Sequence, residues 1–139
     1  MVQLIVGKEG KGKTKHLLAK VNEEIKTVSG NIVYLDRSTK HMFELNNKVR
    51  LVNVQDYDFD NSSEFIGFIY GIISQDHDMQ QMYIDGIMKV AKLEKKDITS
   101  IVKKMEKISN TFNFDFIVSI SADVSDLDEE ISKNIIVAL

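Results

Sequence analysis

A glycine- and lysine-rich segment near the start of the chain constrains the fold more than any other feature. Residues 7–14 read Gly-Lys-Glu-Gly-Lys-Gly-Lys-Thr, match the pattern G-x-x-x-x-G-K-[ST], and directly follow the apolar run of residues 2–6. Glycines let the backbone curl so that successive N–H groups point inward, and a helix that starts there adds the positive end of its dipole. The pattern predicts a strand, a phosphate-binding loop and a helix in direct succession.

The motif assigns roles to individual side chains. Lys13 reaches the β- and γ-phosphates of a nucleotide as a mobile point charge, and the Thr14 hydroxyl becomes a ligand of Mg²⁺. We expect the nucleotide to be bound by the whole segment: Gly7, Lys8, Glu9, Gly10, Lys11, Gly12, Lys13 and Thr14.

On these residues the chain resembles a P-loop NTPase with a complete Walker A motif, and at 139 residues it resembles a minimal one. More narrowly, it is similar to small uncharacterised bacterial P-loop ATP-binding proteins that are sometimes labelled twitching motility (pilus retraction) ATPases. The resemblance implies ATP and Mg²⁺ as cofactors and one nucleotide-binding domain over residues 1–139.

A second signal stands at residues 81–85, an apolar run that ends in Asp85 and predicts a buried strand. By the same resemblance this is the position of a Walker B aspartate, which holds a water of the Mg²⁺ shell. We therefore expect Lys13 and Asp85 to be the catalytic residues and Thr14 and Asp85 to lie on the metal side.

Polar residues also follow the apolar strand predicted at residues 31–36. Open α/β sheets bind ligands beyond the carboxyl ends of their strands, so these residues are candidates of a second tier, with a solvated loop as the alternative. They are Asp36, Arg37, Ser38 and Thr39.

The residue that follows Asp85 affects the expected rate of ATP hydrolysis. Many ATPases carry a glutamate directly after the Walker B aspartate, and here that place is Gly86, which cannot position an attacking water. We therefore expect slow hydrolysis.

By the same resemblance, Ser119 or Ser121, near the end of a strand predicted at residues 114–120, falls where related ATPases carry a polar γ-phosphate sensor.

Strands that alternate with helices predict an α/β fold, a three-layer α/β/α sandwich with a mostly parallel sheet whose strand order the sequence does not reveal. A helix at residues 62–74 should have Asn61 as N-cap and Glu64 as capping-box partner. Gly67 and Gly71 lie on one side of it and allow close packing, within the monomer or, less favoured, in a dimer. The other expected elements are a first helix to residue 28, a near-edge strand at 49–54, a helix at 95–109 and a last strand at 134–139.

Composition narrows the setting. A formal charge of −3 disfavours a general nucleic-acid surface, and the absence of cysteine removes disulfides and thiolate metal sites. No apolar run approaches the roughly 20 residues of a membrane span, so we expect no membrane association and a cytoplasmic location.

Three functions fit these signals. The first is a slow or partner-activated ATPase, and ATP is favoured over GTP because no [NT]-K-x-D motif follows a strand. The second is a nucleotide-gated interaction module without significant hydrolysis, working with a protein partner or as a homodimer. The third is a small nucleoside or nucleotide kinase, although only Arg37 and Arg50 are available for an arginine-rich lid. Lys8 stands where partitioning ATPases carry a second lysine that acts across a dimer, but Glu9 replaces their usual glycine.

Overall fold

Six strands form one sheet in the computed structural model, which describes residues 1–139. The strands are β1 (Val2–Gly7), β2 (Asn31–Asp36), β3 (Arg50–Asn53), β4 (Met79–Ile84), β5 (Asp115–Ser121) and β6 (Ile135–Ala138). Their order is β3-β2-β4-β5-β1-β6, and every neighbouring pair is parallel. The predicted α/β class is confirmed, with a sheet that is parallel throughout.

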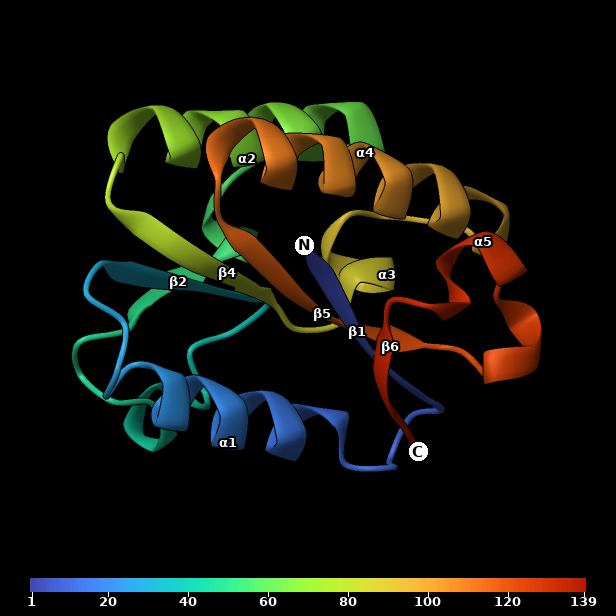
Figure 1. The fold of residues 1–139 in the computed structure, drawn as a ribbon, viewed down its shortest axis with the longest axis horizontal. Coiled ribbons are helices and arrows are strands. Elements are labelled where there is room, and N and C mark those ends of the chain that lie inside the picture. The colour runs from blue at the N-terminus through green and yellow to red at the C-terminus, as the bar shows by residue number, and fades with distance from the viewer.

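Helices cover both faces of this sheet, as Figure 1 shows. They are α1 (Lys13–Glu24), α2 (Ser62–Gln75), α3 (Ile87–Val90), α4 (Ile98–Phe112) and α5 (Glu129–Ser132). The helix α1 lies on one face, and α2 and α4 lie side by side on the other. The predicted three-layer sandwich is therefore present, with a core of 30 buried residues on the α2 and α4 side and one of 11 on the α1 side.

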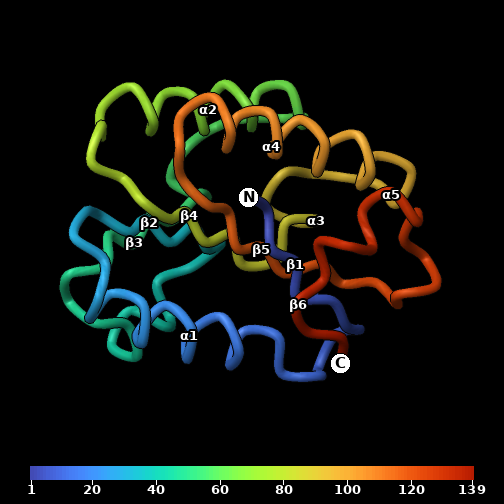
Figure 2. Tube along the Cα trace, in the orientation of Figure 1, coloured from blue at the N-terminus to red at the C-terminus, as the bar shows by residue number.

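The strand order explains why the helices separate in this way. From β1 the chain crosses to β2 in one direction along the sheet, and from β3 it returns through β4 and β5 in the other. Crossovers between parallel strands are right-handed, so a reversal of direction moves the connecting helix to the opposite face. Figure 2 follows this path, and it also shows the C-terminal end beside the loop after β1, where the Leu139 N–H donates to the Val6 carbonyl at 2.8 Å.

The apolar stripe predicted for the helix near residues 95–109 is confirmed. It forms the buried face of α4, which begins three residues later than predicted because residues 95–97 form a 3-10 turn. Ile98, Ile101, Val102, Met105 and Ile108 are each at most 6% exposed. The stripe recurs at helical spacing, and it packs α4 against the sheet.

The start of α2 differs from the predicted capping box in one hydrogen bond. The Asn61 side chain accepts from the Glu64 N–H at 2.9 Å, as an N-cap does. The Glu64 carboxylate accepts from the Asp60 N–H at 2.9 Å, one residue before the N-cap whose N–H a capping box would bind. The N-cap prediction is confirmed, and the reciprocal bond is displaced by one residue.

The favoured interpretation of Gly67 and Gly71 was wrong. Both glycines are exposed on α2, and a Cβ atom built on either would meet no atom within 4 Å. No backbone of the monomer packs against them because α2 turns this side to solvent. Phe65 and Ile69, both fully buried, form the opposite side, which faces the sheet.

Several boundaries also moved. The first helix ends at Glu24 instead of residue 28, although the Val28 N–H still donates to the Glu24 carbonyl at 3.0 Å. The near-edge strand is confirmed as β3, at one edge of the sheet. The short helix α3, directly after Gly86, was not predicted.

None of the helices combines the length and the apolar character that a membrane-spanning helix requires.

Candidate functional site

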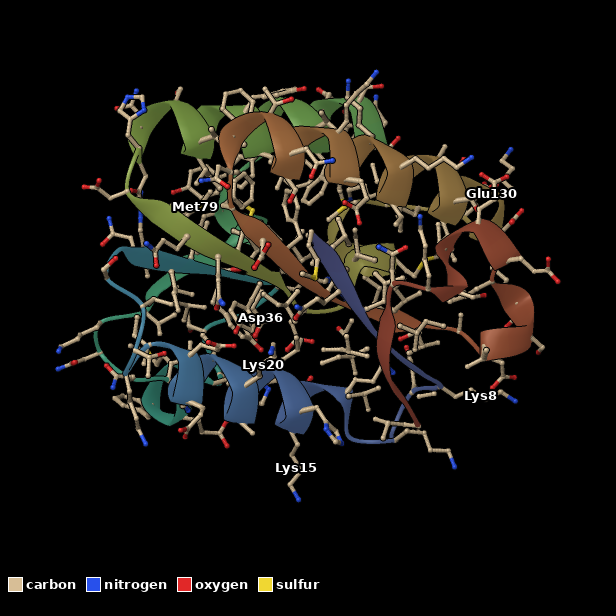
Figure 3. The ribbon with its side chains drawn as sticks, in the orientation of Figure 1. Lys8, Lys15, Lys20, Asp36, Met79 and Glu130 are labelled. Atoms are coloured by element: carbon tan, nitrogen blue, oxygen red, sulfur yellow. The ribbon has the colours of Figure 1, made fainter.

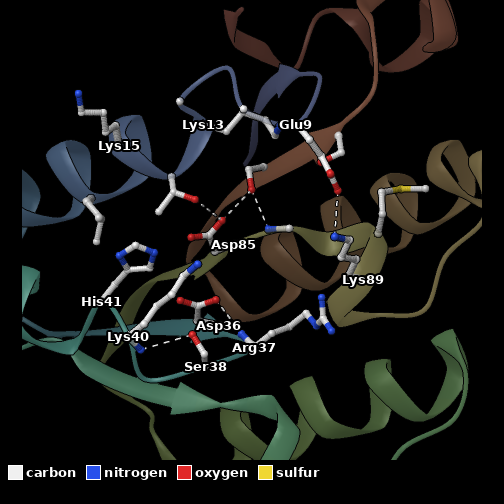
Figure 4. Close-up of a pocket in the computed structure, with 18 of the residues that line it drawn as sticks. Glu9, Lys13, Lys15, Asp36, Arg37, Ser38, Lys40, His41, Asp85 and Lys89 are labelled. Atoms are coloured by element: carbon white, nitrogen blue, oxygen red, sulfur yellow. Dashed lines mark hydrogen bonds and ion pairs between the residues drawn. The ribbon is translucent and has the colours of Figure 1, made fainter.

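Parallel strands bring their carboxyl ends to one edge of the sheet, and a cleft of about 850 Å³ opens there. The loops after β1, β2 and β4 line it together with the end of β5, and only two of its 21 lining residues are hydrophobic. Figure 4 shows how charged side chains from these loops face one another across it. Such a lining suits a ligand that is charged and rich in hydrogen-bonding groups.

The glycine-rich segment forms the loop between β1 and α1. Gly10 has φ +80° and Gly12 has φ +91°, left-handed values that residues with a Cβ rarely adopt. At Gly7 a Cβ would come within 3.0 Å of the Leu139 Cβ, so the chain passes close to its own end here. The loop leads into α1, whose first residue is Lys13. The N–H groups of the first turn of α1, which have no partner within the helix, lie at the edge of the cleft.

Lys13 is buried, at 8% exposure, and its ammonium donates to the Lys8 carbonyl at 2.9 Å. Burial lowers the pKa of this lysine, while the charges of Glu9 and Asp85 act in the opposite direction. The ammonium is thus held inside the loop by a neutral acceptor, in a place where its hydration is reduced. A buried cation of this kind interacts strongly with an anion that reaches it.

Thr14 and Asp85, which the sequence assigned to the same metal, are brought together by the fold. The Thr14 hydroxyl donates to Asp85 Oδ1 at 3.1 Å, although the two residues are 71 positions apart. Asp85 lies directly after β4, and Thr14 is the second residue of α1. A hydroxyl and a carboxylate therefore stand side by side next to Lys13.

Two further side chains hold Asp85. The Tyr34 hydroxyl donates to Asp85 Oδ2 at 2.9 Å, and the Ser119 hydroxyl lies 3.3 Å from Asp85 Oδ1 while accepting from the Gly86 N–H at 2.7 Å. Burial and the Asp85 charge raise the pKa of Tyr34 far above its ordinary value, so it remains a donor. Sequence reasoning had not assigned Tyr34. Its signal was a hydroxyl-bearing residue in an apolar strand, two positions before Asp36.

The side chains of the glycine-rich loop do not all face the cleft. Lys8 pairs with Asp123 at 3.2 Å and is labelled at the edge of the molecule in Figure 3, and Lys11 is exposed and is not a lining residue. Glu9 pairs with Lys89 of α3 at 2.9 Å, and this lysine lowers the pKa of Glu9. The part of the predicted loop that lines the cleft consists of Glu9, Gly10, Gly12, Lys13 and Thr14.

Of the four second-tier candidates at the end of β2 and after it, three line the cleft and one does not. Asp36, Arg37 and Ser38 line the cleft, but Thr39 does not. Asp36 is 8% exposed and lies in the interior of the molecule, as Figure 3 shows. Burial raises its pKa, and the Asp85 charge adds to this, while the Arg37 N–H, His41 and Lys40 act in the opposite direction. His41 and Lys40 also line the cleft and had not been assigned to it.

Both serines proposed as phosphate sensors line the cleft. Ser119 is fully buried and already bonded to Asp85, whereas Ser121 is half-buried at the end of β5. Glu64 accepts from the Asp60 N–H at the start of α2 and does not line the cleft.

No group of three or more His, Cys, Asp and Glu side chains in the structure forms a ready-made metal cage. Mg²⁺ does not require one, because it keeps several waters and is usually bound through one or two carboxylates together with substrate phosphates. The adjacent Thr14 hydroxyl and Asp85 carboxylate fit that requirement in chemistry and number.

No protein-family model matches the chain, and no curated protein matches it either. What the cleft binds therefore has to follow from its own donors, acceptors and charges.

Proposed function

We propose that the chain is a P-loop protein that binds Mg-ATP and acts as a slow or partner-activated ATPase. The contact that carries the proposal is the hydrogen bond between Thr14 Oγ1 and Asp85 Oδ1, beside the buried Lys13. A hydroxyl at a helix N-terminus next to a carboxylate at a strand end is the donor pair that phosphate loops of this pattern use for Mg²⁺.

The residues divide the work in the following way. The loop amides and the N-terminus of α1 attract the phosphate oxygens, and Lys13 exchanges the neutral Lys8 carbonyl for an anionic oxygen. Thr14 and Asp85 would hold Mg²⁺ and its water shell. The ion, when bound, neutralises charge on the β- and γ-phosphates. Tyr34 and Ser119 keep the Asp85 carboxylate in place.

The experiment that tests this is thermal unfolding with nucleotide, with and without Mg²⁺. A ligand that binds only the folded state stabilises it by about 2.7 kcal/mol at a concentration a hundred times its dissociation constant. We expect Mg-ATP and Mg-ADP to raise the unfolding temperature of the wild type, and Lys13→Ala to lose most of the rise.

The matched control is Lys104→Ala, which removes the same charge from the exposed side of α4. It should keep the full nucleotide-induced rise. Equal rises in the wild type and in Lys13→Ala, or a rise that Lys104→Ala also loses, would contradict specific binding at the loop.

One observation favours the nucleotide-gated interaction module as second candidate. Phe43 is 92% exposed and Met42 is 48% exposed, and both lie in a 3-10 turn beside the cleft-lining residues His41 and Glu44. Exposed apolar side chains next to a ligand site are typical of a surface that a protein partner binds. For this candidate Mg-ATP should slow amide hydrogen exchange in residues 37–49 while no phosphate is released.

A further inference from the structure

Asp36 is the only acidic side chain of the chain that is buried. Its Oδ1 accepts from the Arg37 N–H at 2.7 Å, but its Oδ2 is removed from solvent and has no hydrogen-bond partner. A buried carboxylate oxygen without a partner is costly, because the charge loses its hydration and gains nothing in return. Core packing does not explain an acid here, since Asp36 lines the polar cleft.

The register of the sheet places Asp36 on the same side as Thr14 and Asp85, the two residues proposed to hold Mg²⁺. Leu35 of β2 pairs with Ile84 of β4, so Asp36 and Asp85 each follow a paired residue at the same edge. Side chains alternate along a strand, and Tyr34 and Tyr83, two residues earlier, both belong to the cluster on the α1 side. Asp36 and Asp85 therefore share the face that α1 covers, and Figure 4 shows them in the same part of the cleft.

The carboxylates of Asp36 and Asp85 differ in how many of their oxygens already have a hydrogen-bond partner. Both oxygens of Asp85 are engaged, Oδ1 with Thr14 and Ser119 and Oδ2 with Tyr34. Asp36 keeps one oxygen free. Two neighbouring carboxylates in different environments take different roles, one remaining an anion that holds its surroundings and the other accepting a proton.

The groups around Asp36 are consistent with a proton acceptor. Asp85 faces it from the end of β4, and Lys40 and His41 face it from the loop after β2. Burial is the largest influence on its pKa and raises it, which increases its affinity for a proton. No carboxylate is available at the next position after Asp85, because Gly86 has no side chain.

We propose that Asp36 is the general base of this site, the carboxylate that takes the proton from the water attacking the terminal phosphate of bound ATP. The proposal rests on the proposed function. The water O–H bond breaks and its proton goes to the Asp36 carboxylate, while the water oxygen forms a bond to the γ-phosphorus. The bond from that phosphorus to the β–γ bridging oxygen breaks, and its electron pair leaves with ADP. The products are ADP and inorganic phosphate, and Asp36 then returns the proton to solvent.

The test separates binding from chemistry. The dissociation constant of a fluorescent ATP analogue is measured with Mg²⁺, and the single-turnover rate of γ-labelled ATP is measured with protein in excess. Positioned bases contribute about 10²- to 10⁴-fold to rates. We expect Asp36→Asn to keep the dissociation constant within about threefold and to lower the rate at least about a hundredfold.

Two variants complete the design. Asp36→Ala removes the carboxylate without leaving a buried amide, and it should show the same loss of rate. Asp56→Asn makes the same change at an exposed position after β3, and it should leave the rate unchanged.

Each other outcome has a clear meaning. A rate within about threefold of wild type in both Asp36 variants would overturn the proposal, since a base contributes far more. Loss of Mg²⁺-dependent binding in Asp36→Asn would also overturn it, because Asp36 would then act on the metal side. Wild-type protein that binds Mg-ATP without turnover contradicts the base but leaves the binding function standing, and absence of binding overturns both.

Discussion

Lys13, Asp36 and Asp85 carry their charges in three different environments at one edge of the sheet. Lys13 is buried with a carbonyl acceptor, Asp85 is held by three hydroxyl groups, and Asp36 is buried with one oxygen unpaired. Because burial strengthens electrostatic interactions and penalises unpaired charge, each environment predicts a different response to substitution.

At Asp85 the prediction concerns the metal. Asp85→Asn keeps the shape of the side chain but removes the charge that would attract Mg²⁺, so it should weaken the Mg²⁺-dependent part of ATP binding more than the metal-free part. Titration of Mg²⁺ at fixed ATP measures this. A variant that is less stable but has an unchanged Mg²⁺ requirement would show that Asp85 serves only the strand end.

At Asp36 the prediction concerns stability and pH. Its pKa in the folded protein is raised, so folding favours the protonated form, and the contribution of Asp36 to stability is lost as pH rises through that raised pKa. Asp36→Asn should therefore unfold at a higher temperature than wild type at pH 7. The difference should shrink as pH falls and disappear well below about 4, the ordinary pKa of an aspartate, because the acid is then protonated in both states.

Thermal unfolding of both proteins without nucleotide, at several pH values, checks this. A difference that stays constant from neutral to acidic pH would mean that the charge of Asp36 costs nothing in the folded state. A stabilising substitution that also abolishes turnover would identify a residue kept for function at the expense of stability.

At the scale of elements, the start of α2 was predicted correctly. The Asn61 side chain accepts from the N–H three residues on because an N-cap bond is local and depends on a few neighbouring residues. Helix ends were less well predicted. The first helix ends at Glu24, and its continuation to Val28 is an irregular turn.

Asn61→Ala tests the contribution of this cap to α2. Loss of an N-cap side chain typically costs about 1 kcal/mol. We expect a loss of that size in the free energy of unfolding, measured by urea denaturation. Asn47→Ala, in the exposed loop before β3, is the matched control and should change it by less than about 0.5 kcal/mol. Equal losses in the two variants would argue against a specific cap.

At the scale of the whole molecule, the cleft is built from loops of several strands, and Arg37 is the only arginine among its lining residues. Arg37 lines it but is exposed, and Lys8 pairs with Asp123 away from the lining. An arginine supplied by another chain or segment is worth about 10³- to 10⁵-fold in related phosphoryl transfers. If the chain hydrolyses ATP as proposed, an arginine from a partner would add stabilisation that the exposed Arg37 does not supply in the isolated chain.

We accordingly expect the purified protein to release phosphate from ATP at less than about 0.01 s⁻¹, compared with about 1 to 100 s⁻¹ for kinases. A steady-state phosphate-release assay on a monomer fraction measures this. Turnover at about 1 s⁻¹ that Lys13→Ala abolishes would identify a self-sufficient ATPase.

The sequence by itself determined what depends on neighbours along the chain. The glycine loop, its place between β1 and α1, the apolar stripe of α4 and the carboxylate at the end of β4 all follow from local pattern. Alternation of strands and helices was sufficient for the α/β class, because parallel strands need crossover helices.

Tertiary structure alone decided which of these ends meet. Strand order places β5 between β1 and β4, and β2 on the far side of β4, so Ser119 and Tyr34 reach Asp85 from both sides. The same order leaves Asp36 beside Asp85 with an unpaired oxygen. The contacts of Asp85 with Ser119, Tyr34 and Thr14 join residues 34 to 71 positions apart. Strand order depends on how the whole sheet buries its two faces, which no local pattern encodes.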